Sequence, residues 1–208
     1  KVDKEKSNTI VTRYTDFILN RQKEEIASGM MHEVTRSFKP FAANSVNLYI
    51  PNVTNLYGDK LALEWENESE YSLIQVMNIY EDVLFEERVK GKRHILNLSE
   101  DDLKDENLLM VKVYQENDLE STAVAIKRID VEEKKRHAEN LESLTNNISN
   151  SALEELIKAA YFEDNKLLAD AFTSYVNAML LEPDVEEYRS AYNEFLVRHE
   201  LLKFIQKQ

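Results

Sequence analysis

The side chains that could carry chemistry in this chain are its histidines, its acidic clusters and its few glycines. The four histidines are isolated in the sequence: His32, His94, His137 and His199. Metal ligands on a helix need a second ligand three or four residues away, on the same face. No histidine here has a histidine or cysteine partner at that spacing, so the sequence predicts no metal site.

Acidic residues gather at three places, which are 64–70, 100–102 and 105–106. A calcium loop of the helix–loop–helix type needs Asp-x-Asp-x-Asp-Gly spacing, and the segment 100–102 lacks it. The carboxylates of 64–70 alternate along the edge of a predicted strand. Repeated negative charge at a sheet edge discourages aggregation, so a solvated face explains these residues better than a calcium site.

The glycines are Gly29, Gly58 and Gly91, and cysteine is absent. Loops that cradle phosphates need several glycines in close register, which excludes a P-loop and a dinucleotide fingerprint. No Gly-x-Ser-x-Gly nucleophile elbow occurs either. The sequence therefore predicts a protein that is not an enzyme, with no catalytic residues and no cofactor. Paired glycosidase carboxylates are assembled across space, and one sequence leaves that alternative open.

The net charge of the chain limits the classes of partner that it can bind. The 208 residues include 39 acidic and 26 basic side chains, which give a formal net charge of −13. Such a chain repels the polyanionic surface of nucleic acids and of anionic lipid. We therefore expect another protein or a peptide as partner, and no nucleic acid.

Hydrophobic periodicity divides the chain into the segments 1–40, 41–129 and 130–208. In the first segment, apolar residues recur every three to four positions, which predicts an N-terminal helix that ends at Pro40. In the second segment the period changes to two, which predicts about seven strands of an antiparallel β-sandwich. These strands are 46–50, 61–66, 72–76, 83–89, 94–98, 108–114 and 122–129.

Trp65 ends an alternating strand, and Tyr71 begins the next strand after a short acidic loop. With 98–103 leading into 109–114, this pattern resembles a fibronectin type III or related immunoglobulin-like domain. The resemblance covers 41–129 and implies that Trp65 is the tryptophan of the sandwich core.

From residue 130 the period returns to 3.6, which predicts helices, with a break at the Asn- and Ser-rich stretch 145–151. Small and aromatic residues then follow in the order that a helical hairpin needs: Ala159, Phe162, Ala171, Tyr175, Ala178 and Pro183. This segment resembles a tetratricopeptide repeat, and 185–204 would act as its capping helix. The predicted fold class is thus α+β, with an N-terminal helix, a β-sandwich and tetratricopeptide-like helical hairpins.

In the tetratricopeptide family, partner peptides lie on the first helix of each hairpin. The positions that match here are partner-binding candidates: Leu156, Ala160, Glu163 and Asp164. A lone repeat cannot bury both of its faces. The 131–150 helix or the N-terminal helix would cover the remainder, and a second copy of the chain or another protein is the alternative, so homo-oligomerisation is open.

We therefore expect a non-catalytic interaction or scaffold protein. Lys1 in place of a start methionine suggests the soluble part of a membrane-anchored or exported protein, with an anchor upstream of residue 1 and a periplasmic or cell-envelope location. A cytoplasmic location is the alternative. Two functional alternatives remain, which are a ligand-sensing, signal-transducing ectodomain and an enzyme accessory module.

Overall fold

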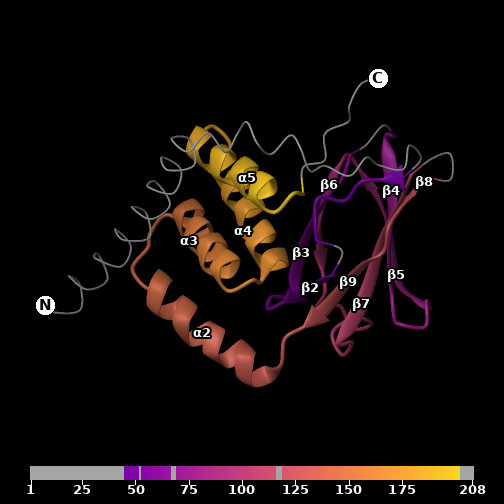
Figure 1. The fold of residues 1–208 in the computed structure, drawn as a ribbon, viewed down its shortest axis with the longest axis horizontal. Helices are drawn as coiled ribbons and strands as arrows, with labels where there is room; N and C mark the ends of the chain where they lie inside the picture. The colour runs from indigo at the N-terminus through magenta and orange to yellow at the C-terminus, as the bar shows by residue number, and fades with distance from the viewer. Residues whose placement is uncertain (1–44, 52, 67–68, 116–118, 202–208) are drawn as a thin grey trace, which may run out of the picture.

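The computed structural model describes residues 45–51, 53–66, 69–115 and 119–201. Nine strands precede four helices within this part of the chain (Figure 1). The predicted α+β class is therefore confirmed. The predicted N-terminal helix lies outside the described residues.

The strands form two sheets. The larger sheet has seven strands: β1 (Ser45–Val46), β2 (Val53–Leu56), β4 (Tyr71–Met77), β5 (Val83–Lys90), β7 (Leu108–Gln115), β8 (Leu119–Ser121) and β9 (Val124–Arg128). Strand β7 pairs with β4 along one side and with β8 and β9, one after the other, along its opposite side. Strands β1 and β2 pair in parallel with β8 and β9. The smaller sheet pairs β3 (Lys60–Glu64) with β6 (Arg93–Asn97).

One hydrophobic cluster joins the two sheets. Alternate residues of β4 and β7 point into it, and so do Leu61 and Leu63 of β3. Trp65 is fully buried, and its indole N–H donates to the Ser72 hydroxyl over 3.0 Å. A buried indole needs such a partner, so the small hydroxyl in β4 fixes how the tryptophan sits in the core.

The helices are α2 (Val131–Thr145), α3 (Ser151–Asp164), α4 (Leu168–Leu181) and α5 (Glu186–Arg198). Asp130 caps α2 by accepting from the Glu133 N–H, and Asn150 caps α3 by accepting from the Leu153 N–H. Such caps satisfy N–H groups that have no partner within the helix. The Asn- and Ser-rich stretch that separates α2 from α3 thus supplies a cap as well as a break.

Several details of the strands differ from the sequence prediction. In place of the predicted strand 46–50, the structure has β1 and an isolated bridge between Leu48 and Trp65. The parallel pairs of β1 with β8 and of β2 with β9 correct the prediction of an antiparallel sandwich. Strand β2 was not predicted, because its four residues include Asn55, a type depleted in strands. The predicted strand 122–129 corresponds to β9, and the short strand β8, which precedes it and pairs with the same side of β7, was not predicted.

Helix α4 covers the free edge of β3. The Ala62 N–H points away from β6 and donates to the Thr173 hydroxyl over 2.9 Å, and that hydroxyl donates to the Ala169 carbonyl. One turn away, the Asp170 carboxylate accepts from the N–H groups of Tyr57 and Gly58 at 2.8 and 2.7 Å. Edge N–H groups must find partners when they are buried, and side chains of α4 provide them.

Helix α5 adds a third polar contact between helices and strands. The Tyr192 hydroxyl donates to the buried Glu64 carboxylate over 2.8 Å. Arg93 donates to the same oxygen from two nitrogens, at 2.8 and 2.6 Å. Burial, followed by the charge of Glu64, raises the pKa of Tyr192 well above its ordinary value, so its hydroxyl remains a donor.

Asp170 offers a test of this packing. Asp170→Ala leaves the partly buried N–H groups of Tyr57 and Gly58 without their acceptor, which costs about 1–3 kcal/mol of unfolding free energy at neutral pH. Urea unfolding followed by circular dichroism measures the loss. Asp184→Ala, an exposed carboxylate in the α4–α5 turn, is the matched control and should change stability by less than about 0.5 kcal/mol. Equal effects of the two substitutions would contradict this role for Asp170.

Candidate functional site

Three of the four residues predicted to bind a partner are buried. Leu156, Ala160 and Glu163 are 9%, 5% and 3% exposed, and Asp164 is exposed at the end of α3. Of this set, Asp164 alone is open to solvent. Partner binding through these positions stays a prediction, and substituting Leu156 would disturb the helical core.

Glu163 holds α3, α4 and α5 together. Its carboxylate accepts from the Tyr175 hydroxyl at 2.9 Å and from two nitrogens of Arg198 at 2.8 and 2.9 Å, and it contacts the His199 ring at 2.9 Å. Burial by itself would raise the pKa of Glu163, but the hydrogen bonds from His199, Arg198 and Tyr175 outweigh it and hold the pKa well below the ordinary value. Glu163 is thus a structural carboxylate within the described helices.

The residues of the predicted hairpin motif occupy the helical core. The five residues that precede the proline are buried in one cluster with Phe172 and Phe195: Ala159, Phe162, Ala171, Tyr175 and Ala178. Pro183 is exposed in the turn between α4 and α5. Tyr71 is half-buried, with the Arg88 guanidinium 4.6 Å from the centre of its ring. Helices α3 and α4 pack side by side, and α5 follows against α4.

Within the described residues, no three His, Cys, Asp or Glu side chains come together in a group that could hold a metal ion. The same part of the chain has no helix that is both long and apolar enough to cross a membrane.

A row of apolar side chains crosses the outer face of the larger sheet. Direct cross-strand pairing aligns five residues, one from each of β2, β9, β7, β4 and β5: Val53, Ala125, Met110, Met77 and Val83. We name these five residues the apolar row. Val53 and Val83, at its two ends, are 77% and 50% exposed, Met110 and Ala125 are half-buried, and Met77 is buried at 6% exposure. Leu108 adds a further exposed side chain beside the row. The four described helices lie near β2 and β3, away from β5 (Figure 1).

The turn between β4 and β5 forms a rigid tip next to the apolar row. We name residues 78–82 the hairpin tip. The Asn78 side chain accepts from the N–H groups of Tyr80 and Asp82 and donates to the Asp82 carboxylate. Glu81 has the left-handed backbone that closes the turn, with φ at 66°. Ile79 and Tyr80 are consequently presented to solvent, at 53% and 77% exposure.

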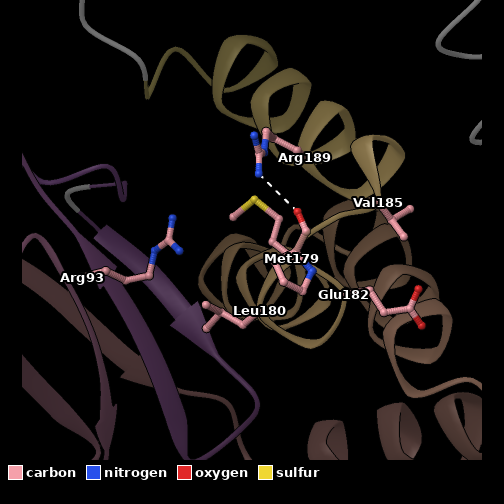
Figure 2. Close-up of a pocket in the computed structure, with 7 residues that line it drawn as sticks. Arg93, Met179, Leu180, Glu182, Val185 and Arg189 are labelled. Carbon is pink, nitrogen blue, oxygen red and sulfur yellow. Dashed lines mark hydrogen bonds between the residues drawn. The ribbon is translucent and has the colours of Figure 1, made fainter.

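A groove of about 210 Å³ lies where the end of α4 meets the start of β6. We name it the arginine groove, and its lining residues are Arg93, Met179, Leu180, Glu182, Pro183, Val185 and Arg189. Figure 2 shows the two guanidinium groups reaching toward it from β6 and from α5, with the Glu182 carboxylate pointing away. The Arg189 side chain donates to the Pro183 carbonyl over 3.2 Å.

Sequence reasoning missed all three surfaces. The apolar row could have been suspected from the runs 83–85 and 108–111, which are apolar at successive positions where a half-solvated strand should alternate. The arginine groove has no such signal, because Arg93 and Arg189 belong to different segments and meet only through the packing of α4 and α5.

Comparisons with known proteins identify no family for this chain. No protein-family model matches the chain, and no curated protein matches its sequence. Two solved structures show a weak likeness: the complex of Porphyromonas gingivalis RgpB pro- and mature domains and the Arg-specific cysteine proteinase gingipain R. Each match has 13% sequence identity and a TM-score of 0.31. It covers 43% of this chain and 19% of the matched chain. A likeness at this level carries no functional argument.

The lowered pKa of Glu163 predicts that its contribution to stability depends on pH. A carboxylate whose pKa falls on folding stabilises the folded state above its unfolded pKa, and that contribution is lost as pH falls. Glu163→Gln should cost about 3–5 kcal/mol of unfolding free energy at pH 7, because Arg198 is left without its buried partner. Urea unfolding from pH 7 down to about pH 3 should show the cost shrinking below the ordinary glutamate pKa of about 4.3.

Glu139→Gln, at an exposed position on α2, serves as the control and should show no such pH dependence. A constant cost of Glu163→Gln across this pH range would contradict the lowered pKa.

Proposed function

We propose that this protein is a non-catalytic protein–protein interaction or scaffold protein that docks a partner on the apolar row. The observation that carries the proposal is the register-aligned row of five apolar residues across five strands, with exposed valines at both ends. Antiparallel sheets with one solvated face usually place polar residues there. An aligned apolar exception on a soluble domain is typical of an interaction surface.

Local charge indicates what kind of partner would fit. Exposed carboxylates of Glu81 and Asp82 stand at one end of the row, and Asp105 follows in the loop before Leu108. Lys127 of β9 lies beside Leu108, and Lys112, two residues from Met110 on the same face of β7, pairs with Glu120 and interacts with Glu81. A partner with apolar side chains bordered by lysine or arginine would complement this surface, and opposite charges would speed and orient docking.

The finer architecture belongs to the same proposal. A fibronectin-like sandwich is supported by the shared core of the two sheets and by the buried Trp65. Tetratricopeptide-like packing is supported by the small residues buried between α3 and α4, and by α5 as the helix that follows. Both arrangements would serve as rigid frames for docking.

The contacts between α4 and the strands favour a scaffold over the sensor alternative. A sensing ectodomain needs a sizeable ligand cavity or a junction that can shift. Asp170, Thr173 and Glu64 instead fix helices to strands by buried hydrogen bonds. We retain an exported or membrane-anchored context as part of the proposal.

The test is a pulldown from an extract of the source cells with the immobilised chain and two variants. Val53→Arg combined with Val83→Arg adds two charges at exposed ends of the row and should leave the melting temperature nearly unchanged. Binding of the captured partner should fall at least about tenfold, because docking would bury unpaired charges. Quantitative mass spectrometry measures the captured amount.

Val131→Arg is the matched control, since Val131 is 81% exposed on α2 and stands apart from the sheet face. A protein lost from the double variant and kept by the control supports docking on the row. If every captured protein binds the double variant as well as it binds the parent chain, the row is not the docking surface.

A further inference from the structure

We propose that the arginine groove binds the hairpin tip of a second copy of this chain. The groove combines apolar side chains with two guanidinium groups, and the one carboxylate in its lining, Glu182, points away from it (Figure 2). The tip combines apolar side chains with two carboxylates. The two surfaces therefore match in both chemistry and charge sign. This inference does not rest on the proposed docking at the apolar row.

The groove contains an arginine side chain, Arg189, that forms no ion pair with the described residues. Arg93 shares its charge with Glu64 and lies over the Tyr192 ring. Within the described residues, Arg189 donates to the Pro183 carbonyl, and no carboxylate lies within ion-pair distance of it. Acidic side chains outnumber basic ones in this chain, at 39 to 26. An anionic group brought into this groove would pair with Arg189.

The floor of the groove is apolar and partly open. Leu180 is 53% exposed, and Met179 and Val185 are half-buried beside it. Its volume of about 210 Å³ is below that of typical small-molecule pockets, which hold about 300–1,000 Å³. A site of this size suits one or two side chains from another protein surface.

The hairpin tip supplies such side chains in a fixed shape. Ile79 and Tyr80 project from the turn, and the Glu81 carboxylate follows directly. Because the Asn78 side chain holds the turn by three hydrogen bonds, little conformational freedom would be lost on docking. Tyr80 or Ile79 would cover Leu180 and Met179, and Glu81 would reach Arg189.

One molecule cannot make this contact with itself. The tip precedes β5, whereas Arg93 follows β5 after the turn at Gly91. An eight-residue strand spans about 25 Å, so the two surfaces lie at opposite ends of the sheet. The contact must join different copies, either as an antiparallel dimer with two such contacts or as an open head-to-tail chain.

Charge reversal on each side tests the contact. The variants are Arg189→Glu in the groove and Glu81→Lys on the tip, and the matched controls are Lys135→Glu and Glu142→Lys, both exposed on α2. Each variant is first compared with the parent by circular dichroism and melting temperature. Sedimentation velocity over a concentration series then measures self-association of each protein and of the two variants mixed in equal amounts.

We expect the parent chain and both controls to associate with a dissociation constant on the order of 100 μM, as befits a small interface. Each reversal alone should weaken association at least about tenfold, and mixing the two variants should restore it, because opposite charges then face each other again. A parent chain that stays monomeric at millimolar concentration would overturn the proposal. So would variants that associate like the parent, or a mixture that fails to recover association.

Discussion

The packing of helices against strands depends on which groups accept hydrogen bonds from the backbone N–H groups at the unpaired edge of β3. Strand β3 pairs with β6 along one edge, and its other edge would expose backbone N–H groups that invite further strands. Helix α4 covers that edge with Thr173 and, at the adjoining turn, with Asp170. Burial raises the pKa of Asp170 to about 6, although the N–H groups of Tyr57 and Gly58 favour its charged form. A Cβ at Gly58 would stand 3.1 Å from the Asp170 carboxylate, so glycine suits this close approach.

The surfaces proposed for binding follow from that docking. With α4 fixed against β3, its C-terminal end and the turn into α5 lie next to Arg93 at the start of β6, and the arginine groove forms there (Figure 2). The described helices occupy the side of the molecule near β2 and β3, away from β5 (Figure 1). The same buried polar contacts therefore position the helices on one side of the strands and form the arginine groove.

Much of the fold was accessible from the sequence because local periodicity is strong in its core elements. The α3–α4 hairpin follows from the spacing of Ala171, Tyr175 and Ala178, and all three are buried between helices. The short strand β2 depends on parallel pairing with β9, which no local pattern encodes. Glu163 was assigned to a binding surface because helix periodicity gives its position on α3 but not the later arrival of Arg198 and His199. The apolar row and the arginine groove arise from register and tertiary packing, so the sequence carries at most a weak signal for them.

Hydrogen exchange at three backbone amides tests most directly whether strands and helices form one rigid scaffold. The amides are those of Tyr57, Gly58 and Ala62, whose acceptors all lie on α4. If the helices separate from the strands only on global unfolding, these amides should exchange with the same opening free energy as the central amide of Val113 in β7. Exchange that is orders of magnitude faster at the three amides, while Val113 stays protected, would show that the helices detach on their own and would contradict the account.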